Sequence, residues 1–225
     1  MEVATTYNAA ERLEQVLAEI ASAAKLGRRL TADIDLIAVS KTRSAAEIAP
    51  LLEAGHRVFG ENRVQEAADK WPELKAAYHS VELHLIGQLQ SNKASEAVAL
   101  FDMIHSVDRL SLISALGKAM RDQSKQVLCF IQVNIGAEQQ KGGCAVEALP
   151  EMLTAAQGAG VPVQGLMCLP PADIEPTPFF ALLADLAARH DLRGLSMGMS
   201  DDFATAIMLG ATHIRVGTAL FGERH

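Results

Sequence analysis

The sequence predicts a (β/α)8 barrel of the TIM type, an α/β fold of alternating parallel strands and helices, with one extra helix at the N-terminus. Three observations predict it. Short apolar runs, typical of buried parallel strands, alternate without a break with amphipathic helical patterns. Eight such runs occur, and a length of 225 residues is ordinary for a barrel of this kind. A doubly wound open sheet is the alternative, but it normally has fewer strands.

The first element is an amphipathic helix over residues 8–28, because Leu13, Val16, Leu17 and Ile20 follow one another at helical spacing. The expected strands are apolar runs bounded by polar residues, at 35–40, 57–59, 83–87, 103–106, 127–133, 163–168, 194–197 and 213–216. The expected helices lie between them, at 44–54, 63–78, 92–100, 109–122, 146–157, 178–190 and 202–209. A proline-rich loop at 169–178 leads into the helix that begins near Pro178, and a short turn follows at 219–221.

Composition and charge argue against several classes of protein. Hydrophobic residues make up 49% of the chain and charged residues 21%, as in ordinary folded proteins. A net charge of −7 argues against general nucleic-acid binding, and no apolar run approaches the roughly 20 residues of a membrane span. The N-terminal segment lacks the pattern of a secretory leader. The scattered cysteines Cys129, Cys144 and Cys168 fit a reducing cytoplasm, without disulfides or zinc. We therefore expect one cytoplasmic domain, residues 1–225, with no metal.

Lys41 stands at the C-terminal end of the first expected strand, in the run Leu-Ile-Ala-Val-Ser-Lys. In a parallel barrel, the mouth at these strand ends is where chemistry is placed. A partly desolvated lysine has a lowered pKa and supplies the neutral amine that forms a Schiff base with an aldehyde. The alternative is a solvated lysine with no such task, and Lys41 alone does not decide between the two.

The loops after the last two strands carry the strongest local signal, because barrels often bind phosphate there. Ser200 is a natural N-cap for the helix after strand seven, so its hydroxyl serves either simple capping or a phosphate contact. Gly217 and Thr218 follow strand eight, where a glycine lets the backbone approach an anion. Arg215 ends that strand beside Lys41, since barrel closure makes the first and last strands neighbours. Its charge is expected to depress the lysine pKa further.

Other polar residues follow the remaining strands, and each of them alone is weak evidence for a site. They are Gly60, Glu61, Asn62 and Arg63 after strand two, Gln88, Gln90, Ser91 and Asn92 after strand three, His105 and Ser106 after strand four, and Asn134 after strand five. The spacing of His79, His84 and His105 does not suit a metal. No P-loop or dinucleotide fingerprint is present. An aldehyde-trapping lysine, a phosphate cradle and an arginine between them describe a site for pyridoxal 5′-phosphate.

Long motifs in the same order make this sequence similar to one known family, over about residues 9–222. They are AVSKT (38–42), FGENRVQE (59–66), HLIGQLQSNK (84–93), HSVDR (105–109), QVN (132–134), EQQKGG (138–143), GLM (165–167), LSMGMSDD (195–202) and HIRVGTALFG (213–222). The chain resembles the YggS/PROSC-type pyridoxal phosphate homeostasis proteins. That resemblance implies a barrel like the N-terminal domain of alanine racemase, without the second domain of that enzyme.

Carried over by position, the resemblance makes Lys41 the Schiff-base lysine. It makes Ser200 and the backbone of Gly217 and Thr218 phosphate donors, and Arg215 the partner of the pyridine nitrogen. Asn62 and Met199 are expected near the cofactor. The resemblance implies no catalytic residue and no metal ligand.

Two functions of different classes remain. The first is a protein that holds pyridoxal phosphate and buffers it or delivers it to apoenzymes, expected here as a monomer; the second is an amino-acid racemase. An arginine at the pyridine nitrogen weakens the ring as an electron sink, which favours the first. Racemisation also needs a second base, and Tyr7 and Tyr78 are expected in helices away from the mouth. His105 and Lys141 are the candidate substitutes. A third, weaker alternative is an inactive barrel that serves as an interaction module.

Lys141, in the loop after strand five, is either a solvated loop lysine or a second contact for the aldehyde during transfer. The sequence leaves both open.

Overall fold

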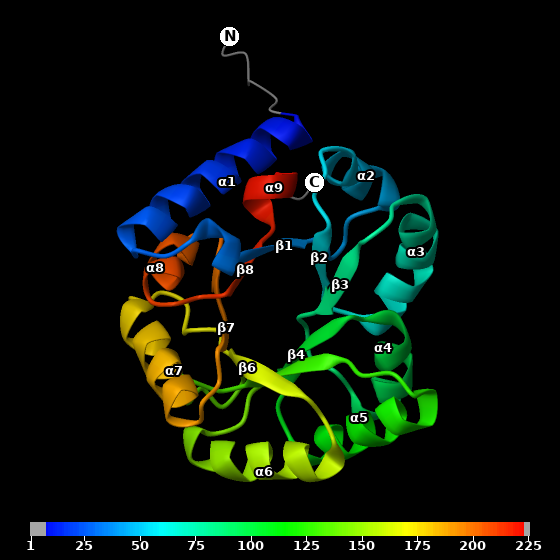
Figure 1. Cartoon of the computed structure of the whole chain (residues 1–225), viewed down its shortest axis with the longest axis vertical. Coiled ribbons are helices and arrows are strands. Elements are labelled where there is room, and N and C mark those ends of the chain that lie inside the picture. Colours follow the sequence, from blue (N-terminus) through cyan, green and yellow to red (C-terminus); the bar gives the residue numbers. More distant parts are fainter. Residues whose placement is uncertain (1–7, 223–225) are drawn as a thin grey trace.

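The computed structural model describes residues 8–222 and shows a closed barrel of parallel strands surrounded by helices (Figure 1). The strands are neighbours in the order of the sequence, β1 to β8, and β8 pairs with β1 to close the barrel. The closing register sets Ile37 opposite Arg215 and Ala38 opposite Val216. The predicted (β/α)8 fold is therefore confirmed, and the open-sheet alternative is excluded.

The strands are β1 (Asp35–Val39), β2 (Val58–Glu61), β3 (Glu82–Leu85), β4 (Met103–Val107), β5 (Leu128–Gln132), β6 (Val163–Met167), β7 (Gly194–Met199) and β8 (His213–Val216). The α-helices are α1 (Ala9–Leu26), α2 (Ala45–Glu53), α3 (Val64–Ala77), α4 (Ala94–Leu100), α5 (Leu110–Gln123), α6 (Leu149–Ala159), α7 (Thr177–Arg189), α8 (Phe203–Met208) and α9 (Thr218–Phe221). Short 3-10 helices are η1 (Thr31–Asp33), η2 (Ser91–Lys93) and η3 (Val146–Ala148). Every predicted strand has an observed counterpart whose ends differ by two residues or fewer.

Two predicted helices, at 92–100 and 146–157, begin instead with the 3-10 turns η2 and η3. For the second, the sequence gives the reason. Pro150 has no N–H, so an α-helix that started at Val146 would lack one of its first hydrogen bonds. A tight turn instead closes through the bond from the Ala148 N–H to the Ala145 carbonyl, and Pro150 falls in the first turn of α6, where no N–H is needed.

The extra N-terminal helix α1 lies outside the ring and packs against α8 and α9 (Figure 1). Its start is fixed by a capping box, in which Asn8 and Glu11 each accept a hydrogen bond from the other's backbone N–H at 2.9 Å. After α1, Arg29 Nη1 donates to the carbonyls of Ile207 and Ala211, at the end of α8. The helix thus covers the place where the barrel closes.

Side chains alternate along each strand between an outer layer under the helices and the barrel interior. Phe59 of β2 packs on Trp71 of α3 in the outer layer. In the interior, His213 of β8 lies edge-on to Phe130 of β5, with ring centroids 5.0 Å apart. Because β8 pairs only with β1 and β7, this contact crosses the barrel. Gly194 makes room for it, since a Cβ there would lie 2.7 Å from the Phe130 ring.

Within residues 8–222, no helix is long and apolar enough to span a bilayer.

Candidate functional site

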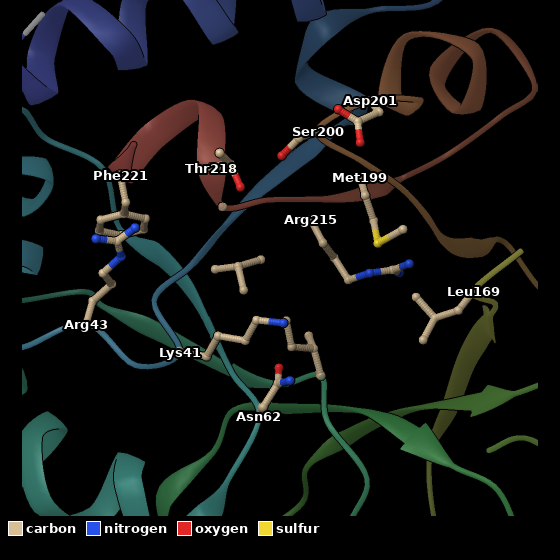
Figure 2. Close-up of a pocket in the computed structure, with 13 residues that line it drawn as sticks. Lys41, Arg43, Asn62, Leu169, Met199, Ser200, Asp201, Arg215, Thr218 and Phe221 are labelled. Atoms are coloured by element: carbon tan, nitrogen blue, oxygen red, sulfur yellow. The ribbon is translucent and has the colours of Figure 1, made fainter. Parts of the chain in front are cut away.

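A pocket of about 510 Å³ opens at the carboxyl end of the barrel. It is lined by Val39, Lys41, Arg43, Asn62, Ile86, Leu169, Met199, Ser200, Asp201, Arg215, Gly217, Thr218 and Phe221. The structure therefore brings together all seven residues that the sequence placed around a cofactor. Figure 2 shows the Lys41 and Arg215 side chains extending into the same space, with Ser200 and Thr218 along another side of it.

Lys41 follows β1 by two residues and lines the pocket together with Val39, which precedes it by one strand period; Figure 2 shows its side chain extending into the pocket. The turn behind it is tightly held. Thr42 has a left-handed backbone, with φ of 61°, and its N–H donates to Glu66 Oε1 at 2.5 Å. Its hydroxyl donates to the Lys41 carbonyl at 2.6 Å. These bonds fix the direction in which the Lys41 side chain leaves the backbone.

A buried polar cluster lies behind this turn, between β1, β2 and α3; we call Ser40, Glu61, Lys70 and Trp71 the Glu61 network. Glu61 Oε1 accepts hydrogen bonds from Ser40 Oγ at 2.5 Å and from Trp71 Nε1 at 2.9 Å, and it lies 3.0 Å from Lys70 Nζ. Lys70 Nζ also donates to the carbonyls of Ser40 and Arg43, each at 3.0 Å. The network therefore ties the backbone on both sides of Lys41 to α3.

The prediction that Glu61 lies at the mouth is wrong. It is the last residue of β2, it is fully buried, and its side chain lies on the outer face of the strand. Asn62, the next residue, does line the pocket, as strand alternation requires. Gly87 leaves room for the Asn62 backbone, because a Cβ at Gly87 would lie 2.3 Å from the Asn62 carbonyl oxygen.

Arg215 is buried in the floor of the pocket. Its Nη1 donates to Ser196 Oγ at 2.7 Å and its Nη2 to the Cys168 carbonyl at 2.9 Å. Burial lowers the pKa of Arg215 from its ordinary value, and the nearby Cys168 and Asp202 side chains oppose that shift. A guanidinium nevertheless keeps its proton in proteins, so Arg215 brings a fixed positive charge to the pocket.

The predicted helix cap at Ser200 is wrong. Helix α8 begins only at Phe203, with Asp202 at the N-cap position. Asp202 Oδ1 instead accepts the Met199 N–H at 2.5 Å and closes the loop. Since Ser200 is not required as a cap, its hydroxyl remains available in the pocket wall, on the same side as the Thr218 hydroxyl (Figure 2).

Gly217 lies directly before α9, on the pocket wall. Its φ of −116° suits any residue, so the backbone conformation does not require a glycine. The nearest atoms to a Cβ there would belong to Val39, another pocket residue, at 3.5 Å. A side chain at this position would therefore take up space that a ligand could otherwise use, and the glycine leaves the Thr218 backbone accessible.

Several polar residues predicted at the mouth do not line the pocket. Gln88, Gln90 and Asn92 are exposed, and Asn134 exchanges two hydrogen bonds with the Glu138 backbone. His105 and Ser106 do not follow strand four, since both belong to β4 and are fully buried.

Lys141 lies beside the mouth but not in the lining. Its Nζ lies 2.7 Å from Glu138 Oε2 and donates to the Pro170 carbonyl at 2.9 Å, which links the loops after β5 and β6. Of the two tyrosines expected away from the mouth, Tyr7 lies outside the described residues, and Tyr78 is the C-cap residue of α3 and does not line the pocket.

Sequence reasoning missed several residues of the pocket. Val39 could have been found, because it precedes Lys41 by one strand period. No local sequence pattern predicts that the pocket is also lined by Arg43, Leu169 and Phe221. The Arg43 guanidinium lies over the Phe221 ring, 5.6 Å from its centroid, and donates to the Gly222 carbonyl, so the turn after β1 closes on α9 at the rim.

The fold and the lysine at the mouth together define the class of protein. The profile described as "Alanine racemase, N-terminal domain" matches residues 16–225, and the chain belongs to that family. An alanine racemase from Clostridium difficile has the same fold, with a TM-score of 0.70 at 16% identity, and the match covers 95% of this chain and 57% of that one.

Within this class, the chain belongs to the pyridoxal phosphate homeostasis proteins. It is 41% identical to the protein of that name from Pseudomonas aeruginosa over 223 residues, with 96% of this chain and 95% of the relative covered. It is 38% identical to the Escherichia coli K12 protein, with 96% of each covered. The structure of PipY from Synechococcus elongatus PCC7942 with PLP bound matches with a TM-score of 0.76 at 38% identity, covering 90% of this chain and all of PipY.

Proposed function

We propose that this protein holds pyridoxal 5′-phosphate on Lys41 and serves in pyridoxal phosphate homeostasis, as a buffer or as a donor to apoenzymes. One observation supports this above all. Lys41 and Arg215, from the neighbouring strands β1 and β8, extend into one pocket whose wall is formed by Ser200, Gly217 and Thr218.

The pocket suits each part of the ligand. Pyridoxal phosphate supplies an aldehyde, and the Lys41 amine holds it through a C=N bond whose formation releases one water. Arg215 faces the pyridine nitrogen as a hydrogen-bond donor. The hydroxyls of Ser200 and Thr218 and the backbone after Gly217 bind the phosphate, while Asn62 and Met199 flank the ring. A volume of about 510 Å³ is in the usual range for a small-molecule site.

The charge of Arg215 also favours a protein that holds pyridoxal phosphate over an enzyme that uses it to convert a substrate. Because the guanidinium keeps its proton, it donates to the ring nitrogen and leaves that nitrogen unprotonated. An unprotonated ring draws electrons weakly, which narrows the chemistry that the bound cofactor supports. The racemase alternative further needs a base at the ligand, and the candidates His105 and Lys141 both lie outside the pocket lining.

A visible absorbance spectrum tests the proposal. We expect purified wild type, given pyridoxal phosphate, to show the band of the lysine-bound aldehyde, and Lys41→Ala to lack it. Lys141→Ala is the matched control and should keep the band, because Lys141 does not line the pocket. A colourless wild type would overturn the proposal. Incubating the loaded protein with L-amino acids and following optical rotation separates holding from racemisation, and turnover there would favour the enzyme.

Lys141 itself remains a candidate for a transient bond to the aldehyde during transfer. Its amine lies beside the mouth, and the side chain is 29% exposed. Borohydride reduction followed by mass mapping checks this prediction, and label found only at Lys41 under every loading condition would contradict it.

We further propose that the chain acts as one cytoplasmic unit and as a monomer, with pyridoxal-phosphate-dependent apoenzymes as recipients. All three cysteines are buried thiols, as expected in a reducing compartment. Light scattering of the purified protein checks the monomer. Mixing loaded protein with an apoenzyme and following the recovery of its activity checks delivery.

A further inference from the structure

Three histidines lie in the interior of the barrel, below the pocket. His84 and His105, from β3 and β4, stack with ring centroids 5.1 Å apart, and His105 stacks on Phe130 at 4.6 Å. His213 of β8 lies edge-on to His105. All three imidazoles are buried, and none of them is among the residues that line the pocket.

Two of these histidines belong to a continuous line of polar contacts that ends at Arg215. Arg215 Nη1 lies 2.7 Å from Ser196 Oγ, which lies 2.8 Å from His105 Nδ1. His105 Nε2 lies 3.1 Å from His84 Nδ1. His84 Nε2 faces Glu82 Oε2 at 3.8 Å, at the amino end of the barrel. We call Glu82, His84, His105, Ser196 and Arg215 the histidine chain.

One direction of hydrogen bonding, starting at the arginine, satisfies every donor and acceptor from Arg215 to the Nδ1 atom of His84. A guanidinium only donates, so Ser196 Oγ accepts from it and turns its own hydrogen toward His105 Nδ1. His105 then carries its proton on Nε2 and donates to His84 Nδ1. His84 accepts this bond at Nδ1, while its Nε2 lies 3.8 Å from the Glu82 carboxylate and makes no hydrogen bond within residues 8–222. The donors from Arg215 to His105 thus all point away from the buried cation.

The surroundings keep His105 neutral, as this arrangement requires. Burial lowers the pKa of His105 well below its ordinary value, and the nearby His84, His213 and Arg215 lower it further. The other titratable groups around the chain are Asp35 and Asp102 near its amino end, and Cys168 and Asp202 beside Arg215. His213 stays outside the chain, because its Nδ1 meets Thr212 Oγ1 at 2.8 Å and its Nε2 faces Asp35 Oδ2 at 3.4 Å.

We propose that His105 and His84 are positioning residues: the contact between His105 and Ser196 keeps the Ser196 oxygen in place as the acceptor of Arg215 Nη1, and this holds the guanidinium toward the pocket. The effect on the ligand rests on the proposed function, in which Arg215 faces the pyridine nitrogen. The direction of the chain is a property of the protein without ligand.

Nitrogen-15 NMR of the ligand-free protein at pH 7 tests the direction. We expect His105 as the neutral tautomer with the proton on Nε2, and we expect Arg215→Ala to remove this preference. A proton on Nδ1 of His105 in the wild type, or a charged His105, would overturn the proposal. Neither result depends on whether pyridoxal phosphate binds.

Two matched variants test the effect on the pocket. His105→Phe keeps a ring against Phe130 but removes both links of the chain, whereas His213→Phe changes a neighbouring ring and leaves the chain intact. We expect pyridoxal phosphate to bind about tenfold more weakly to His105→Phe, with the pH midpoint of the visible band shifted by about half a unit or more. We expect His213→Phe to match the wild type in both.

Equal behaviour of the two phenylalanine variants would show that the rings only fill the barrel, and it would overturn the proposal. If His105→Phe does not fold, His105→Gln retains one amide that can accept from Ser196 and donate to His84. We expect the glutamine variant to bind nearly as well as the wild type. A wild type that takes up no pyridoxal phosphate would instead refute the proposed function. The NMR experiment would still test the direction of the hydrogen bonds, because it uses the ligand-free protein.

Discussion

Two buried polar networks support Lys41 and Arg215, two of the basic residues of the pocket, and they lie on opposite faces of the barrel wall. The Glu61 network is outside, between the strands and α3, and it contains a charged pair, since Glu61 and Lys70 meet at 3.0 Å. The histidine chain is inside, and the groups that touch the Arg215 guanidinium are a serine hydroxyl and a backbone carbonyl, both neutral.

The difference follows from what each network must do. Behind Lys41, the Lys70 ammonium holds two backbone carbonyls in place, and the Glu61 carboxylate cancels its charge locally. Below the pocket, a carboxylate bound directly to Arg215 would neutralise the charge that the ligand is to meet. Neutral acceptors orient the guanidinium and leave its field directed into the pocket. The same barrel therefore supports the turn at Lys41 with a charged pair and the Arg215 guanidinium with neutral acceptors.

The largest effect is expected from breaking the charged pair. Glu61→Gln removes the buried carboxylate and leaves the Lys70 ammonium, whose side chain is only 11% exposed, without its buried counter-charge. We expect a loss of about 3 kcal/mol in the free energy of unfolding, measured by urea denaturation. Glu66→Gln is the control, because Glu66 also meets Lys70 at 2.9 Å but is 28% exposed, and it should cost less than about 1 kcal/mol. Equal losses in the two variants would contradict the prediction.

Acid is expected to destabilise the protein through the buried histidines of the barrel interior. Burial lowers the pKa of His213 to about 3, and it lowers that of His105 in the same direction. The unfolded chain takes up protons at these histidines near pH 6.5, while the folded protein does not. Stability is therefore lost as the pH falls below about 6.5, by up to about 1.4 kcal/mol per pH unit for each such histidine.

Urea unfolding at pH 7, 6 and 5 measures this slope. His213→Phe removes one of the groups that take up a proton on unfolding, so its slope should be smaller than that of the wild type. Parallel slopes for the two proteins would show that the acid sensitivity lies elsewhere.

The smallest effects are expected from removing one serine hydroxyl from each network. Ser40→Ala removes the hydroxyl that donates to Glu61, and Ser196→Ala removes the one between Arg215 and His105. We expect each to cost about 1–2 kcal/mol of stability. Only Ser196→Ala should also weaken pyridoxal phosphate binding severalfold, as measured by fluorescence titration. If Ser40→Ala weakens pyridoxal phosphate binding as much as Ser196→Ala does, the inference that only the histidine chain affects binding is wrong.

Much of the site could be predicted from local sequence, because it depends on where strands end. Lys41 and Arg215 follow apolar runs, and the alternation of elements places strands one and eight side by side. The glycine and hydroxyl residues after the last two strands were found by the same reasoning. All of these residues do line one pocket.

Reasoning from the ends of strands does not predict the two polar networks. Glu61 comes directly after a strand-like run, which predicts the mouth, yet strand alternation turns it outward against Trp71 of α3. His84, His105 and His213 lie far apart in the sequence, and each has a polar or charged neighbour that suggests a strand end. Nothing local shows that the three rings meet across the barrel.

The sequence by itself determined the barrel, the lysine and arginine at its mouth and the family, because periodicity and motif order are properties of neighbouring residues. The tertiary structure alone decided which polar residues face the ligand and which support them. That choice depends on strand register and barrel closure, which set the side chain of every strand residue either inside the barrel or under the helices.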